Sequence, residues 1–190
     1  EERNRIMVDA ISDLLFIPSE DAKENLLKEK VSSDKIHNVG NIMIDTLAKN
    51  KSKIINNSEN IRNNLNINKS YFVVTLHRPS NLNDDILEDV FEAISNFTDD
   101  FQVILPAHPR LKNYIENNNV ELSNIILIDP LSYIDFMSLV YGSDLVLTDS
   151  GGIQEETTYL GINCLTLREE TERPITVQEG TNKVIGTDKE

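Results

Sequence analysis

The chain has 190 residues, of which 39% are hydrophobic and 26% are charged, a balance typical of a globular protein rather than a disordered or fibrous one. It contains 18 lysines and arginines against 32 aspartates and glutamates, which gives a formal charge of −14. This charge argues against binding to nucleic acid, which requires a basic surface, so any anionic ligand must be held by a few local groups.

Short apolar runs alternate with longer amphipathic segments, which is the pattern of βα units. The first part of the chain predicts strands at 14–17 and 36–39 and helices at 19–30 and 41–66. A more regular alternation follows, with strands at 71–76, 102–105, 125–128, 145–148 and 164–167 and helices at 82–97, 111–118, 133–141 and 153–160. We therefore expect an α/β fold with a doubly wound, mainly parallel sheet.

Polar residues follow several of the predicted strands of this second part. They are His77 and Arg78 after its first strand, His108 after its second, residues 149–152 after its fourth and Arg168 after its fifth. In doubly wound sheets, ligands bind in the crevice beyond the carboxyl ends of the strands. We therefore expect these residues to gather at one edge of the sheet.

A turn of small residues joins the predicted strand 145–148 to the next helix, and residues 148–156 read Thr-Asp-Ser-Gly-Gly-Ile-Gln-Glu-Glu. Either Ser150 caps the helix, with Glu155 and Glu156 complementing its dipole, or the backbone N–H groups of the turn bind an anion such as diphosphate. The spacing matches neither a P-loop nor GxGxxG, which disfavours ATP hydrolysis and NAD binding. A carboxylate in the first helical turn can accept ribose hydroxyls, and Glu156 is the better candidate.

Four basic groups close to the expected crevice are candidates for holding an anion, namely His77, Arg78, Arg168 and Arg173. An imidazole beside a fixed cation can neutralise a diphosphate leaving group or transfer a proton. The alternatives are a structural histidine and, around the two later arginines, a solvated and charge-balanced loop.

Other chemistry is disfavoured by spacing and by composition. His77, His108 and Asp149 lack the spacing of known metal motifs, so we expect no metal site. Phe136 reads as a core residue on periodicity alone. The single cysteine, Cys164, lies in an apolar run, which excludes a disulfide framework and fits a reducing compartment. No apolar stretch has the length of a membrane helix, so we expect no membrane partner.

Taken together, the motifs resemble one family, the non-hydrolysing UDP-N-acetylglucosamine (UDP-GlcNAc) 2-epimerases, which share the two-domain GT-B architecture of many glycosyltransferases. The matching strings lie at residues 1–5, 38–41, 75–78, 147–156, 171–174 and 179–182. They follow the family's order over nearly the whole chain. The resemblance implies that the fold is the Rossmann-like half of a GT-B protein.

The resemblance also implies an activity. Members of this family interconvert UDP-GlcNAc and UDP-ManNAc by eliminating UDP to a 2-acetamidoglucal and adding it back, and the products are precursors of cell-surface polysaccharides. The step is an elimination rather than an oxidation, so no cofactor is expected. The resemblance further implies a cytoplasmic enzyme that is a homodimer at full length, with a UDP-sugar as its partner and neither nucleic acid nor membrane.

Roles for individual residues follow from the same resemblance. It implies that UDP is bound by Phe136 near the uracil, by Glu156 at the ribose, and by Ser150, Gly151, Gly152 and Arg173 at the diphosphate. His77 is the expected catalytic residue, beside the departing UDP. Residues matching Arg78 and His108 contact a second, activating UDP-GlcNAc in bacterial members, and Arg168 is a further candidate for an effector or phosphate contact.

The two ends of the chain suggest a fragment, because it begins at Glu1 without Met and stops just after an apolar run. We expect residues 1–36 to be a remnant of an N-terminal Rossmann-like domain and residues 37–190 to form an incomplete C-terminal UDP-binding domain. In the family, the N-terminal domain supplies the carboxylates that move the C2 proton. The chain by itself is therefore expected to be inactive.

Three alternative functions stay open at this point. Ile175 stands where many family members have Glu after Arg-Pro, which leaves room for a related substrate such as UDP-2,3-diacetamido-glucuronate. A GT-B glycosyltransferase would bind UDP through similar features but would transfer the sugar. A regulatory module would bind a nucleotide sugar without turnover.

Overall fold

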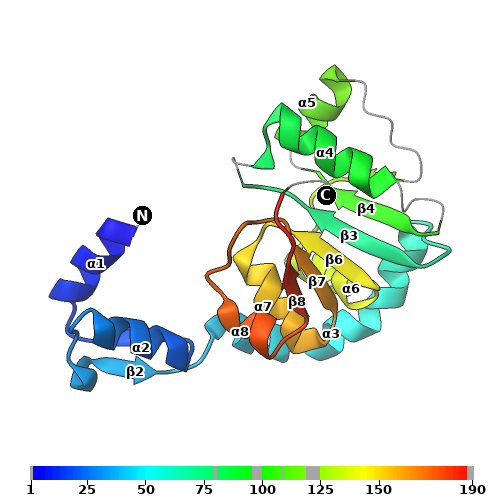
Figure 1. Cartoon of the computed structure of the whole chain (residues 1–190). Coiled ribbons are helices and arrows are strands. Elements are labelled where there is room, and N and C mark those ends of the chain that lie inside the picture. Colours follow the sequence, from blue (N-terminus) through cyan, green and yellow to red (C-terminus); the bar gives the residue numbers. More distant parts are fainter. Residues whose placement is uncertain (1, 79–80, 96–99, 108, 119–124, 188–190) are drawn as a thin grey trace. The chain divides into compact units, whose positions relative to one another are not determined.

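The computed structural model describes residues 2–78, 81–95, 100–107, 109–118 and 125–187 (Figure 1). The chain divides into two compact units, Glu1–Ala48 and Lys49–Glu190, which are described separately. Within the described ranges, no helix has both the length and the apolar character needed to cross a membrane.

The first unit is built around a pair of short parallel strands. Its elements are α1 (Glu2–Ile11), β1 (Leu15–Ile17), α2 (Glu20–Lys28), a 3₁₀ turn η1 (Ser33–Lys35) and β2 (Ile36–Asn38). The two strands pair in parallel from Leu15 opposite Ile36 onward. Leu15, Ile17, Leu26 and Ile36 form a small buried cluster. This unit confirms the two strands predicted for the first part of the chain and the helix between them.

The second unit holds the larger sheet. Its elements are α3 (Ile42–Asn64), which begins in the first unit, β3 (Tyr71–Thr75), α4 (Asp84–Ser95), β4 (Gln102–Pro106), α5 (Pro109–Asn117), β5 (Ile125–Ile128), α6 (Tyr133–Tyr141), β6 (Leu145–Thr148), α7 (Gly151–Leu160), β7 (Asn163–Thr166), α8 (Pro174–Gln178) and β8 (Asn182–Val184). The strand order is β5-β4-β3-β6-β7-β8, and every neighbouring pair is parallel. This confirms the predicted doubly wound α/β fold.

The strand order reverses between β3 and β6. The chain builds outward from β3 to β4 and β5, and then returns to place β6 on the other side of β3. The last residues of the two strands, Thr75 and Thr148, are register partners, and their hydroxyl oxygens lie 2.6 Å apart. Such a switch point opens a crevice beyond the carboxyl ends of the strands.

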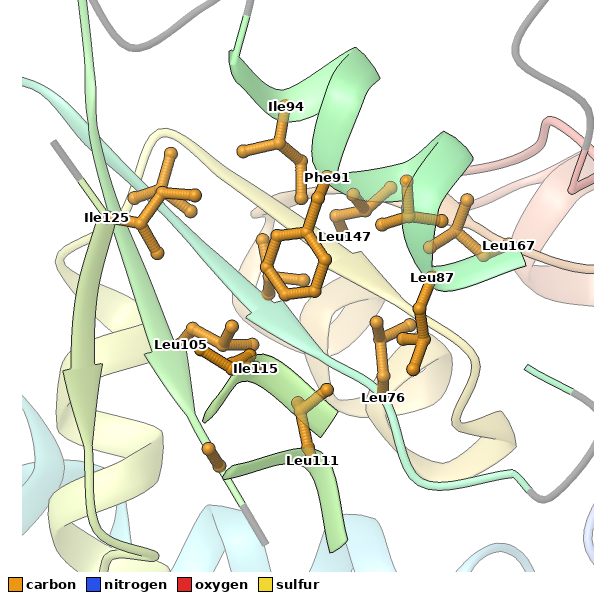
Figure 2. Close-up of a cluster of buried hydrophobic side chains, with 14 of the residues drawn as sticks. Leu76, Leu87, Phe91, Ile94, Leu105, Leu111, Ile115, Ile125, Leu147 and Leu167 are labelled. Atoms are coloured by element: carbon orange, nitrogen blue, oxygen red, sulfur yellow. The ribbon is translucent and has the colours of Figure 1, made fainter. Parts of the chain in front are cut away.

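Helices cover both faces of this sheet. In Figure 1, α4 and α5 lie on one side and α3, α6 and α7 on the other. Leu87, Phe91 and Ile94 follow one another at helical spacing along α4 and pack into the buried cluster of Figure 2 with Leu105 and Leu147 of the sheet. The apolar core therefore lies on the faces of the sheet, and polar residues lie at the edge formed by the carboxyl ends of its strands.

Two elements of the second unit are absent from the sequence prediction. β8 has three residues and contains Lys183, so it lacks the apolar run that signals a strand. α8 has five residues and begins at Pro174, a common first helical residue. The helix predicted at 153–160 begins two residues earlier, at Gly151, which changes the placement of its carboxylates.

Candidate nucleotide site

The residues that follow β3 and β6 lie together because these two strands are neighbours. His77 and Arg78 follow β3, and residues 149–152 follow β6. Arg168 follows β7, the next parallel strand, and therefore lies at the same edge. The predicted gathering of polar residues at this edge is confirmed for these groups. His108, which we expected there too, lies outside the described residues.

Asp149 holds the loop after β3. Its carboxylate is fully buried, and it accepts hydrogen bonds from the backbone N–H groups of His77 at 3.1 Å and Arg78 at 2.9 Å. A buried carboxylate needs such donors to offset its lost hydration. The imidazole Nδ1 of His77 lies 2.8 Å from Oδ1 of Asp149, while the side chain is 58% exposed. This contact leaves Nε2 as the imidazole nitrogen available to a ligand.

The turn at the start of α7 does not use its serine as a cap. Ser150 occupies the N-cap position, but its side chain makes no capping hydrogen bond, and its own backbone N–H donates to Oγ1 of Thr148 at 3.0 Å. Within α7, all of which is described, the first turn contains no acidic residue. The interpretation that the Ser150 side chain caps the helix is therefore wrong, and the first N–H groups of α7 are not satisfied by its hydroxyl.

The expectation of a carboxylate in the first helical turn is also wrong. α7 begins at Gly151, so Glu155 and Glu156 lie in its second turn. Glu156 is 3% exposed, and the hydroxyl of Tyr133 on α6 donates to its Oε1 at 2.9 Å. Burial raises the pKa of Glu156, and the neighbouring charge of Glu155 adds to this rise. Among the described residues, no cation forms an ion pair with Glu156.

The arginines of the crevice are paired with carboxylates. Glu172 forms ion pairs with Arg78, at 3.2 Å, and with Arg168. Burial alone would raise the pKa of Glu172, but its own backbone N–H and the two arginines outweigh that effect and lower it. Arg173 Nε lies 3.2 Å from Glu155 Oε2, although the two groups lack the alignment of a hydrogen bond. The expected cluster of cations exists, with each arginine already facing an anion.

Glu172 also lies against the small-residue turn. A Cβ atom added to Gly151 would lie 2.9 Å from Oε1 of Glu172. The carboxylate therefore occupies the space in front of the first residue of α7. Since a larger residue at 151 would fill this space, glycine is what allows an anion, here the Glu172 carboxylate, to lie against the turn.

A buried polar network fixes the loop that carries Glu172. Gln154 on α7 is fully buried, and its Oε1 accepts hydrogen bonds from Thr171 Oγ1 at 2.6 Å and Asn182 Nδ2 at 3.1 Å. Asn182 Oδ1 in turn accepts from Thr166 Oγ1 at 2.6 Å. This network joins the loop to α7, β7 and β8. It gives a structural role to the matched strings at 171–174 and 179–182.

Two further residues considered from the sequence are Phe136 and Cys164. Phe136 is half-buried on α6, one turn after Tyr133, and its role near a uracil stays a prediction. Cys164 is buried in β7, and burial raises the pKa of its thiol. In the described ranges, no group of three His, Cys, Asp or Glu side chains could hold a metal ion.

Three residues of this site were not proposed as site residues from the sequence: Asp149 as the partner of His77, Tyr133 as the partner of Glu156, and Glu172. Asp149 and Glu172 lie within the matched strings, which is the available signal for them. Tyr133 lies one helical turn before Phe136, on the same face of α6.

Comparison with known proteins gives one consistent result. The chain matches the protein family described as UDP-N-acetylglucosamine 2-epimerase over residues 1–190. Its relatives include the UDP-N-acetylglucosamine 2-epimerases of Methanocaldococcus jannaschii and of Bacillus subtilis, each 40% identical to the chain. All of this chain is covered in both matches, which extend over 55% and 50% of those proteins.

Solved structures agree with these sequence matches. The Methanocaldococcus jannaschii UDP-GlcNAc 2-epimerase in complex with UDP-GlcNAc and UDP superposes with a TM-score of 0.87 at 40% identity, over 100% of this chain and 54% of that chain. The Neisseria meningitidis UDP-GlcNAc 2-epimerase bound to UDP-GlcNAc gives a TM-score of 0.84 at 33% identity, over 100% of this chain and 53% of that chain. The chain thus spans about half the length of the proteins it matches.

Proposed function

Because the chain belongs to the UDP-N-acetylglucosamine 2-epimerase family, we propose that it is the UDP-binding half of an enzyme that interconverts UDP-GlcNAc and UDP-ManNAc. The observation that carries this proposal is the juxtaposition, at the switch point of the sheet, of an open glycine turn, a buried carboxylate and a cluster of arginines. Two solved relatives are complexes with UDP-GlcNAc, which supports a UDP-sugar as the ligand.

The nucleoside is expected to lie along α6 and α7. The carboxylate of Glu156 can accept hydrogen bonds from both ribose hydroxyls, and Tyr133 holds it in place with a hydrogen bond of 2.9 Å. The absence of a cationic partner for Glu156 among the described residues leaves its oxygens available to neutral donors. Phe136, one turn further along α6, is the candidate for packing against the uracil.

The diphosphate is expected at the start of α7. Backbone N–H groups at a helix N-terminus favour an anion, and residues 150–152 form that terminus here. Arg78 and Arg168 lie at the same turn through their contacts with Glu172. Arg173 is the third candidate, from the other side of the loop. Together these groups supply local positive charge in a chain that is acidic as a whole.

The chemistry assigned to His77 is stabilisation of the leaving UDP. In the elimination, a base takes the proton from C2, the C1–O bond breaks, and its electron pair leaves with the diphosphate. Nδ1 of His77 is held by Asp149, which leaves Nε2 for the departing oxygen. Nε2 acts there as a hydrogen-bond donor or an acid when both imidazole nitrogens carry a proton, a form that the Asp149 carboxylate stabilises. The reverse step adds the diphosphate oxygen back to C1 and returns a proton to C2 on either face.

The remaining parts of the enzyme are assigned as follows. Residues 1–36 are proposed as part of the N-terminal domain and residues 37–190 as the UDP-binding domain. The separate parallel pair β1–β2 supports a division into two parts, but β2 crosses this boundary and the two compact units divide between Ala48 and Lys49. The base that acts at C2 is assigned to the rest of the N-terminal domain, because the resemblance implies that this domain supplies the carboxylates that move the C2 proton. A cytoplasmic homodimer completes the proposal.

The test is proton exchange at C2. A protein of the relatives' full length that contains this chain should convert UDP-GlcNAc to UDP-ManNAc. In deuterated water it should also incorporate deuterium at C2, which NMR detects. The 190-residue chain alone should bind UDP without either reaction. Exchange catalysed by this chain alone would overturn the assignment of the base. Sugar transfer without deuterium uptake would indicate a glycosyltransferase, and binding without turnover at full length would indicate a regulatory module.

A further inference from the structure

Glu172 is placed where a ligand phosphate is expected. Its Oε1 lies 3.2 Å from Nη2 of Arg78, its Oε2 pairs with Nη1 of Arg168, and the same Oε1 would lie 2.9 Å from a Cβ atom on Gly151. One carboxylate thus meets two guanidinium groups and the open side of the glycine turn. These are the groups assigned above to the diphosphate.

The surroundings of Arg78, Arg168 and Glu172 show which of these side chains are held in place. Arg78 is fixed at its base, because its backbone N–H and its Nε both donate to Asp149, at 2.9 Å and 3.1 Å. The Arg168 side chain is 15% exposed, whereas that of Glu172 is 44% exposed. The arginines are therefore the more fixed partners, and the carboxylate is the one that can leave.

The loop behind Glu172 does not depend on this carboxylate. The neighbouring Thr171 anchors the loop through its hydrogen bond to Gln154, and the backbone N–H of Arg173 donates to Oγ1 of Thr171 at 3.0 Å. Rotation of the Glu172 side chain away from the turn breaks two ion pairs and leaves this network intact. Movement of the carboxylate is thus separable from unfolding of the loop.

We propose that Glu172 is an internal substitute for the ligand phosphate: it occupies Arg78, Arg168 and the glycine turn in the free protein, and a nucleoside diphosphate displaces it. The inference rests on the proposed function and adds the way in which the site exchanges one anion for another. Without ligand, the carboxylate prevents two cations from facing each other unpaired. With ligand, its loss offsets part of the binding energy, so the nucleotide is held less tightly and released faster.

The experiment compares Glu172→Gln with the unchanged 190-residue chain by calorimetry, with UDP, inorganic pyrophosphate and uridine as probes. The amide keeps the shape of the side chain but gives up its charge. We expect UDP and pyrophosphate to bind about three- to tenfold more tightly, which is the scale of two partly exposed ion pairs. Uridine affinity should not change, because uridine brings no phosphate to the arginines.

Glu170→Gln is the matched control, since Glu170 is an exposed carboxylate in the same loop. It removes the same charge and should leave the affinity for UDP within about twofold. Circular dichroism and the melting temperature of each variant report whether the fold is retained. Glu172→Ala, which removes the carboxylate by truncation, should change affinity in the same direction as Glu172→Gln.

The outcomes separate this inference from the function on which it rests. Unchanged or weaker binding of UDP and pyrophosphate to Glu172→Gln would overturn the inference, because the carboxylate would then orient the arginines rather than compete for them. An equal gain in Glu170→Gln would also overturn it, since a general charge effect would explain the gain. If UDP binds no better than pyrophosphate, the nucleotide assignment fails, while tighter pyrophosphate binding to Glu172→Gln would still support the exchange.

Discussion

The two halves of the proposed nucleotide site hold their carboxylates in opposite ways. In the nucleoside half, Glu156 is buried, accepts one hydrogen bond from a neutral tyrosine, and has a raised pKa. In the diphosphate half, Glu172 is partly exposed, meets two arginines, and has a lowered pKa. Glu156 lies on α7 and Glu172 lies against the first residue of the same helix, so the difference comes from their partners.

This comparison shows how one crevice can prepare for two kinds of ligand group. A buried carboxylate with a single neutral donor keeps acceptor capacity for hydroxyl groups, which bring no charge. A carboxylate that bridges two cations occupies a place suited to a negatively charged group. The nucleoside half is therefore specific for hydrogen-bond donors, and the diphosphate half for anions.

The most severe way to break the diphosphate half is to fill the glycine turn. Gly151→Val should abolish detectable UDP binding to the 190-residue chain, because the valine side chain would fill the space in front of the turn where the diphosphate is expected. Oε1 of Glu172 occupies this space in the free protein, 2.9 Å from an added Cβ. The clash is with the end of a flexible side chain, so the fold should be retained, as judged by circular dichroism. Gly151→Ala should give an intermediate loss. Unchanged affinity of the valine variant by calorimetry would remove the turn from the site.

The next largest effect is expected from substitution of His77, the residue assigned to the leaving UDP. In a protein of the relatives' full length, His77→Asn should lower kcat by about 100-fold, the scale of one general acid or electrostatic group, with a smaller change in KM. Asp149→Asn should lower kcat by about tenfold or more, because it disturbs the orientation and tautomer of the imidazole.

A double variant distinguishes positioning by Asp149 from a purely structural role. If Asp149 acts through His77, the variant with both substitutions should lose little more activity than His77→Asn alone. The pH profile of kcat should also shift in Asp149→Asn but not in a variant that is merely less stable. Additive losses together with an unshifted pH profile would assign Asp149 to the scaffold between β3 and β6.

The nucleoside half should be more tolerant. Glu156→Gln is expected to weaken UDP binding by about tenfold, the value of a charge-assisted hydrogen bond to the ribose. Glu155→Gln should have a smaller effect, because the Glu155 carboxylate faces Arg173 at 3.2 Å. Calorimetry on both variants checks this order. Equal losses of UDP affinity in the two variants would mean that both glutamates act only through their interaction with the dipole of α7.

The smallest effect expected is a pH dependence that belongs to the nucleoside half. Since burial raises the pKa of Glu156, its carboxyl becomes protonated at a higher pH than an ordinary glutamate. UDP affinity should therefore decline as the pH is lowered through that pKa, because a protonated carboxyl accepts ribose hydroxyls less well. The terminal phosphate of UDP also changes its charge, with a pKa of about 6, so the measured quantity is the difference between the unchanged chain and Glu156→Gln.

The free energy of unfolding of the chain without ligand should depend on pH in the opposite direction to UDP affinity: it should fall as the pH rises. A group with a raised pKa in the folded state contributes stability below its unfolded pKa, and this contribution is lost as the pH rises through the folded pKa. Glu156→Gln should remove that loss and flatten the profile of melting temperature against pH. A profile that stays unchanged in the variant would place the responsible titration elsewhere.

Much of the second unit was accessible from the sequence because its signals are local. The apolar runs of β3, β4, β5 and β6 and the helical periodicity of α4 each lie within one short window. The position of the site followed from a general property of parallel sheets, whose carboxyl ends share one edge. The residues at that edge could therefore be named before their contacts were known.

The contacts themselves could not be predicted, because they join residues far apart in the chain. Arg78 and Glu172 are separated by 94 positions, and the pairing of His77 with Asp149 spans 72. Neither periodicity nor charge distinguishes Glu172 from Glu169 or Glu170 in the same loop, and the matched string at 171–174 is the one signal that does, without naming its partners. The first-turn placement of Glu156 was wrong because a boundary shift of two residues moves a side chain into the next turn.

The labelling rate of the single thiol of the chain can be used to measure local opening of the sheet. Cys164 is 1% exposed in β7, with its strand paired to β6 on one side and β8 on the other. Its thiol interacts with Thr157 of α7, so labelling by a thiol reagent requires movement of the elements packed around β7, and its raised pKa further slows reaction in the closed state. The rate of labelling therefore reports local opening around β7 and α7, next to the nucleotide site. A bound nucleotide that stabilises the closed sheet should lengthen the labelling half-time without touching the sulfur.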